Sequence, residues 1–319
     1  MLRYILKKIL LALPVLLGIT LLDYALMCAA GSPIEMMTGP RMTEEAIALK
    51  AQTWGLDQPL WKQYLGWMGE LLQGNLGYSY KSYQPVSAII GDAIGPTLLL
   101  MGASMVVGLL IAIPAGIYSA VHRYKKRDYA VVTGSFLASS IPSFFLAMLL
   151  VYVFTVVLGW LPSSGMTTPG TGGDWLDVLR HMVMPVMVLA VFVAGSNIRY
   201  IRAAVLEILE KDYLRTAKAK GIGRRRVILS HGMRNALLPI VTVIGMQIPM
   251  LLGGSVVVEQ VFSWPGLGLI TMNAITSRDY PVIMGVCLLS AVLVLVSNLI
   301  TDIVYALVDP TIEYGKGKR

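Results

Sequence analysis

Three polar side chains lie within long apolar stretches of the sequence, where lipid or a packed core would surround them. They are Asp23, Asn298 and Asp302. An unpaired carboxylate at the centre of a bilayer costs about 2.5–3.5 kcal/mol on insertion scales, so such residues mark solute pathways or pair across helices. We expect Asp23 to be paired, protonated or near the outer headgroups, and Asp302 to form an interfacial or interhelical hydrogen bond. The three residues are the intramembrane candidates for a pathway.

The patterns of hydrolytic and metal chemistry are missing from the sequence. No two of His122, His181 and His231 have the i, i+4 spacing of a helical metal site, and Cys28 and Cys287 lie far apart in apolar runs. Neither G-x-S-x-G nor H-E-x-x-H occurs. We therefore expect no catalytic residue, no metal site and no disulfide framework in this chain.

The composition requires that most side chains face lipid. Hydrophobic residues make up 56% of the 319 positions and charged residues 14%, and the mean hydropathy is +0.69. About 20 apolar residues span a bilayer as a helix. Six stretches meet this length, at 9–30, 97–121, 129–158, 181–198, 236–258 and 281–308. We expect an all-α polytopic membrane protein, whose first span exceeds a signal-peptide core and is retained.

The distribution of positive charge predicts the topology. With the amino terminus inside, the inner segments 1–8, 122–128, 199–235 and 310–319 hold 20 of the 26 Lys and Arg residues. This asymmetry places both termini on the cytoplasmic side. It also explains the net charge of +8 as anchoring beside headgroups, and argues against nucleic-acid binding.

The outer loop between the first two spans has the pattern of two helices. Thr43 is a suitable N-cap for the first, and Gly55 a suitable end. The second runs from Pro59 to Gln73 with one apolar face. Two interpretations stay open for this second helix: it lies against the bilayer through its tryptophans, or it packs beneath the loop.

The inner loop 199–235 reads as helix, break, helix. A short helix covers 213–220 and a second covers 224–235, with Gly221-Ile222-Gly223 between them. Two short helices folded at glycine form a knob that a partner protein can grip. A loop that only anchors charge remains the alternative.

Residues 212–221 read DYLRTAKAKG and residues 231–239 read HGMRNALLP. These motifs resemble those of the permease subunits of ATP-binding cassette (ABC) importers, in the first-permease branch of the dipeptide, oligopeptide and nickel systems. Gly221 matches the glycine of the general family motif, while Arg215, Thr216 and Ala217 stand where that motif has Glu-Ala-Ala. Further matching segments are 55–60 (GLDQPL), 74–79 (GNLGYS), 261–268 (VFSWPGLG) and 278–281 (RDYP).

The resemblance implies two functional regions. The candidate ATPase-coupling residues are Tyr213, Arg215, Thr216, Ala217, Lys218, Lys220, Gly221 and Gly223. The candidates for the outer mouth are Phe262, Trp264, Pro265 and Gly266. For this second segment, an interfacial turn anchored by Trp264 is the other interpretation.

The resemblance also implies the partners. Gly315-Lys316-Gly317 lacks the spacing and hydroxyl of a nucleotide-binding loop, so ATP and Mg would be used by two ATPase subunits and no cofactor by this chain. A second homologous permease and an extracytoplasmic solute-binding protein complete the assembly, in the bacterial inner membrane. The predicted domains are 1–30, 31–96 and 97–319.

The function implied is import of short peptides by alternating access, with nickel or a metal chelate as the alternative substrate. An ATP-independent secondary transporter is a remote alternative, since no inverted repeat or midplane charge pair is found. A membrane enzyme is disfavoured by the missing motifs.

Overall fold

The computed structural model describes most of the chain in residue-level detail. The described residues are 2–29, 31, 43–170, 174–212, 216, 220, 223, 245, 247–249, 251–253 and 255–308. Most of the predicted fifth span (236–258) and the second inner-loop helix (224–235) lie outside them.

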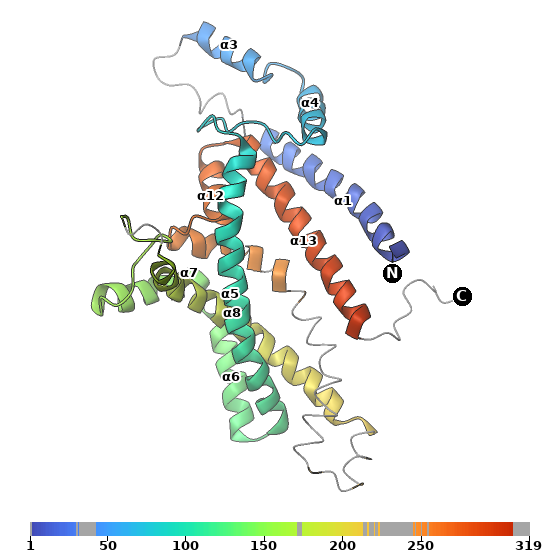
Figure 1. Cartoon of the computed structure of the whole chain (residues 1–319), viewed down its shortest axis with the longest axis vertical. Coiled ribbons are helices and arrows are strands. Elements are labelled where there is room, and N and C mark those ends of the chain that lie inside the picture. The colour runs from blue at the N-terminus through green and yellow to red at the C-terminus, as the bar shows by residue number, and fades with distance from the viewer. Residues whose placement is uncertain are drawn as a thin grey trace. The chain divides into compact units, whose positions relative to one another are not determined.

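The described residues form helices and no strand (Figure 1). The helices with defined bounds are α1 (Leu2–Ala29), α3 (Glu44–Thr53), α4 (Leu60–Leu72), α5 (Val86–Val121), α6 (Lys126–Ser140), α7 (Ser143–Leu150), the π-helical segment η1 (Val151–Val157), α8 (Trp175–Leu209), α12 (Leu267–Thr276) and α13 (Tyr280–Val308). Four of them, α1, α5, α8 and α13, are long and apolar enough to cross a membrane. The all-α, polytopic prediction is confirmed, while the total of six spans and the side of each terminus stay predictions.

The stretch predicted as the third span is divided by a sharp bend. The segments Lys126–Ser140 and Ser143–Val157 meet at 92°. Pro142 has no N–H to continue the helix and forces the residue before it out of the helical region. Accordingly, Ile141 has ψ 122° and Pro142 has ψ 134°. The segment is therefore a broken span or a re-entrant turn.

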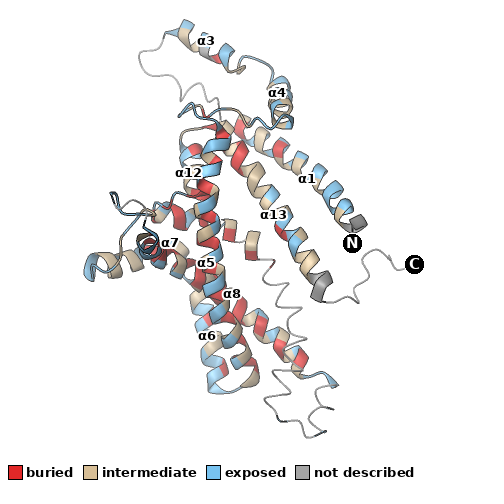
Figure 2. Cartoon of the chain, viewed as in Figure 1, coloured by how far each residue is buried: buried red, intermediate tan, exposed pale blue. Residues whose placement is uncertain are grey.

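The chain divides into two compact units, and the first contains residues 98–264 and 296–319. Helix α8 is its centre, because sixteen of its residues are buried, whereas α6 shows mostly intermediate and exposed positions (Figure 2). Glycine lets α5 approach α8 closely. A Cβ added at Gly116 would lie 2.8 Å from Ile201 Cγ2 and 3.0 Å from the Ile198 carbonyl oxygen, and one added at Gly108 would lie 2.6 Å from Val193 Cγ1.

The second unit contains residues 2–97 and 265–295. Its core joins the start of α5, including Val86 and Ile90, to α12 and the first half of α13. A buried carboxylate fixes the segment before α5: Asp279 accepts a hydrogen bond from the Ser79 hydroxyl and one of 3.0 Å from the Tyr80 N–H. Most of α1 is exposed, as expected for a helix that faces lipid.

The predicted pair of outer-loop helices matches α3 and α4. The N–H of Ala46 donates to Thr43 Oγ1 at 3.3 Å, as expected for an N-cap, and Gly55 has φ +65°. Helix α4 contacts α1 through Tyr64, whose ring centroid lies 5.4 Å from that of Tyr24. Trp61, three residues before Tyr64, is 62% exposed, so α4 packs against α1 and still presents apolar surface that can meet lipid.

Candidate functional site

The predicted ATPase-coupling loop is described at three of its candidate positions, Thr216, Lys220 and Gly223, all exposed. Thr216 Oγ1 donates to the Asp212 carbonyl oxygen at 3.1 Å, and the Lys220 N–H donates to the Thr216 carbonyl oxygen at 3.1 Å. Both bonds have the i to i−4 spacing of a helix, in agreement with the helix predicted before the glycine break. The other candidates, Tyr213, Arg215, Ala217, Lys218 and Gly221, lie outside the described residues.

An ion pair joins α8, the helix that precedes this loop, to α6. Arg202 of α8 donates from Nε and Nη2 to the two carboxylate oxygens of Asp128 in α6, each at 2.7 Å. Asp128 is 2% exposed, and it also accepts from the Ser119 hydroxyl of α5 and from the Tyr124 N–H. The ends of α5, α6 and α8 are thus fixed to one another by a single carboxylate.

A second, exposed pair links Arg123, just after α5, to Glu210, just after α8. The sequence interpretation of the basic run 123–127 as membrane anchoring missed both pairs. Two acidic residues in the sequence could have indicated these ion pairs. Asp128 directly follows the basic run, and Glu210 follows the last apolar turn of α8. Basic residues that only anchor the chain beside lipid headgroups need no acidic partner within the protein.

The candidates for the outer mouth include two core side chains. Phe262 is 2% exposed and Trp264 is fully buried within the first unit, where the Phe262 carbonyl oxygen accepts from the Gly165 N–H at 2.7 Å. The interpretation of Trp264 as an anchor at the lipid interface is therefore wrong, because its indole ring packs in the core. Pro265 is exposed and Gly266 is buried, and their place at an outer mouth stays a prediction.

The intramembrane polar candidates have different surroundings. Asp23 of α1 lies beside the Cys287 thiol of α13, and its place in a solute pathway stays a prediction. Asn298 is exposed and Asp302 half-buried. Asp23 belongs to the second unit, and Asn298 and Asp302 belong to the first.

Sequence reasoning missed a buried amide pair and a half-buried arginine in the first unit. Gln247 Nε2 donates to Asn197 Oδ1 at 3.2 Å, and Asn197 is fully buried. Arg199, two residues further along α8, lies 4.4 Å from the Phe136 ring centroid and donates to the Ser139 hydroxyl at 3.1 Å. The sequence did offer a signal for them, because Asn197 and Arg199 are polar residues at the end of a predicted span.

Long apolar helices, a helix that leads into an exposed inner loop, and polar groups buried between spans are the features of a membrane-embedded transporter subunit. Solved structures of ABC transporters share the fold. An inward-facing MetNI methionine ABC transporter matches with a TM-score of 0.58 and 20% identity over 69% of this chain and 96% of that chain. An amino acid ABC transporter solved with histidines matches with a TM-score of 0.52 and 14% identity, over 69% and 94%.

The family follows from the sequence comparisons. Residues 112–314 match the family described as binding-protein-dependent transport system inner membrane component, and residues 1–101 match its N-terminal counterpart. The chain belongs to this family of ABC importer permeases and is a multi-pass protein of the bacterial inner membrane. The resemblance stated from the motifs is confirmed, and with it an assembly that contains ATPase and membrane components.

Curated relatives match over the whole chain. The oligopeptide transport system permease protein AppB of Bacillus subtilis (strain 168) is 44% identical over 98% of this chain and 100% of its own length. A putative peptide permease protein of Brucella ovis is 45% identical over 98% and 99%. The glutathione transport system permease protein GsiC of Escherichia coli (strain K12) is 39% identical over 98% and 100%.

Proposed function

We propose that this chain is the permease subunit of an importer that moves short peptides across the inner membrane. The observation that carries the substrate class is the full-length similarity to permeases described as transporting oligopeptides and glutathione. Oligopeptides and glutathione are both peptides, and the two relatives come from different bacteria. A nickel or metal-chelate substrate has no comparable support.

The proposed assembly pairs this chain with a second homologous permease, two ATPase subunits and an extracytoplasmic binding protein. ATP and Mg are used by the ATPases, and this chain itself carries no catalytic residue and no cofactor. Its part in the cycle is mechanical: it changes which side of the membrane the solute pathway faces. Helix bundles with two packings of similar energy support such a change.

The inner loop is the proposed lever. Movement of an ATPase that grips residues 213–223 reaches α8 directly, because α8 ends at Leu209. The Asp128–Arg202 pair passes the movement to α6, and the hydrogen bond between Asp128 and Ser119 passes it to α5. A flexible connection at this place would absorb the movement without transmitting it.

The lever is tested by the substitution Gly221→Pro. Proline fixes φ and removes the backbone donor, so we expect peptide uptake to fall to background while the subunit still inserts and assembles with its partners. Uptake by vesicles that contain the full complex measures the effect, with Gly221→Ala, which keeps the backbone donor, as the matched control. Normal uptake by the Gly221→Pro complex would refute the lever.

The substrate class is tested separately with the unmodified complex. ATP turnover is measured with a panel of dipeptides, longer peptides, glutathione, free nickel and chelated nickel. We expect stimulation by peptides. Stimulation by chelated or free nickel alone would contradict the peptide assignment. It would not affect the proposal that the inner loop transmits the movement of the ATPase.

A further inference from the structure

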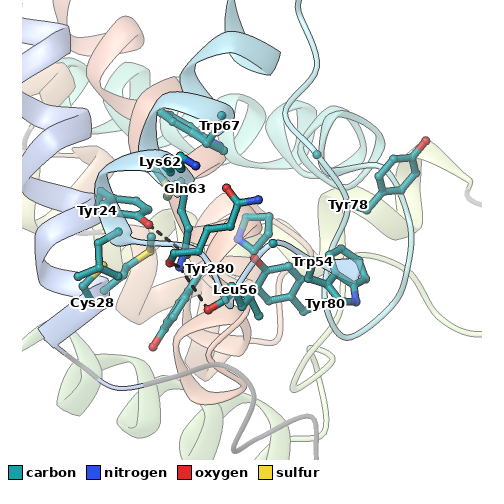
Figure 3. A pocket seen from close by; sticks show the side chains of 18 of the residues that line it. Tyr24, Cys28, Trp54, Leu56, Lys62, Gln63, Trp67, Tyr78, Tyr80 and Tyr280 are labelled. Carbon is teal, nitrogen blue, oxygen red and sulfur yellow. Dashed lines mark hydrogen bonds between the residues drawn. The ribbon is translucent and has the colours of Figure 1, made fainter. Parts of the chain in front are cut away.

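A cavity of about 600 Å³ lies within the second unit, bordered by four segments of the chain (Figure 3). The end of α1 contributes Tyr24 and Cys28, and the start of α13 contributes Tyr280. The third segment is α4 together with the residues just before it, and the fourth is the stretch before α5. Cavities of 300–1,000 Å³ suit small ligands, and the peptide pathway of the proposed function does not require this one.

The polar groups at the cavity suit an anion. Lys62 contributes an ammonium group, and Trp67, which also lines the cavity, has its Nε1 donor buried with no partner among the described residues. None of the described lining residues is a carboxylate. Gln63 is already engaged, because it accepts from the Tyr24 hydroxyl at 3.2 Å and donates to the Gln58 carbonyl oxygen at 2.7 Å.

The Tyr80 hydroxyl adds a neutral donor to the same walls. Burial, followed by the charge of Asp279 and by Tyr280, raises the pKa of Tyr80 to about 12. The phenol therefore keeps its proton at physiological pH. It adds no negative charge that would repel an anion.

The remaining lining is apolar and borders the lipid-facing helix. Leu56, Leu60, Leu76, Met27 and Met284 provide this surface. Exposed leucines of α1 such as Leu26 lie one turn or less from the cavity residues Tyr24 and Cys28. By the charge asymmetry of the sequence, this end of α1 is the outer one. A ligand with an anionic head and an apolar tail can thus enter from the bilayer.

We propose that the cavity binds a phospholipid of the outer leaflet, with its phosphate at Lys62 and Trp67 and part of an acyl chain against the apolar wall. Such a lipid joins the outer end of α1 to α4 and to the start of α13. Tryptophan and lysine are common at this depth of a membrane protein because indole and ammonium groups suit the headgroup region. The proposal is independent of which solute the importer carries.

The two native cysteines give a test without any substitution. Cys28 lines the cavity, whereas Cys287 does not. In the delipidated complex in detergent, added phosphatidylglycerol is expected to slow alkylation of Cys28 about tenfold and to leave Cys287 unchanged. Inorganic phosphate and a dipeptide are the comparison arms. Equal protection by the dipeptide would assign the cavity to peptide, and no protection by phosphatidylglycerol would overturn the proposal.

A second test uses substitutions and a photoactivatable phosphatidylglycerol. The double variant Lys62→Gln, Trp67→Phe removes the positive charge and the indole donor while it keeps an aromatic ring, so crosslinking to residues 60–72 should fall about tenfold. The matched control, Lys81→Gln with Trp175→Phe, changes the same residue types where they do not line the cavity. An equal loss in the control would show general attraction to lipid and overturn the specific site. Assembly with partners and basal ATP turnover confirm that both variants fold.

Discussion

Asp128 joins α6 to residues near the ends of α5 and α8. Its carboxylate meets Arg202 at two oxygens and receives hydrogen bonds from Ser119 and Tyr124. Bidentate pairs between arginine and carboxylate are specific in geometry as well as strong. One side chain therefore holds three helices in register beside the proposed coupling loop.

The substitution Asp128→Asn should lower the stability of the complex by about 1.5–3 kcal/mol, because a charged and buried hydrogen-bonded pair is replaced by an amide that opposes a guanidinium. Thermal unfolding in detergent measures the shift. Glu210→Gln is the matched control, since Arg123 and Glu210 pair in solvent and exposed pairs contribute little. If both variants unfolded at the temperature of the unmodified complex, the central role of Asp128 would be wrong.

At the scale of elements, the contact between α5 and α8 depends on glycines in α5, which have no side chain to hold the helices apart. Gly108 and Gly116 lie two turns apart, with buried Ala112 between them. Small residues at i, i+4, such as Ala112 and Gly116, favour close helix packing. The structure identifies α8 as the neighbour, with Val193 and Ile201 filling the space above the glycines.

The substitution Gly116→Val should destabilise this contact by about 1–3 kcal/mol, because a new side chain would overlap Ile201 and the Ile198 backbone. Gly102→Val in the same helix is the control, since a Cβ there meets nothing within 4 Å. Thermal unfolding and the yield of assembled complex compare the two. Equal effects would indicate that loss of glycine in α5, and not helix contact, causes the change.

At the scale of the whole molecule, the charge asymmetry predicts which segments meet the cytoplasm. Single cysteines are introduced at Lys125 and Gln58 in a chain that carries Cys28→Ser and Cys287→Ser. We expect an impermeant maleimide to label position 125 only in inverted vesicles and position 58 only in right-side-out vesicles. Labelling of both positions from one side would contradict the predicted topology, and with it the leaflet of the proposed lipid.

The sequence by itself determined the class of the protein. Apolar length predicts helices in lipid whatever their neighbours are, because each helix satisfies its own backbone hydrogen bonds. Local signals also placed α3 and α4, since the cap at Thr43 and the left-handed Gly55 act within a few residues. The motifs of the inner loop led to the family in the same way, from residues close together along the chain.

Only the tertiary structure decided which distant residues meet. Asp128 and Arg202 are 74 positions apart in the sequence, and Ser79 and Asp279 are 200 positions apart. Trp264 is buried, although tryptophan is a residue type that suits a membrane interface. The cavity near Trp67 is formed by four segments, none of which has a recognisable pattern alone. Pairing and burial of this kind depend on helix packing, which is set by shape and volume across the chain and leaves no fixed spacing in the sequence.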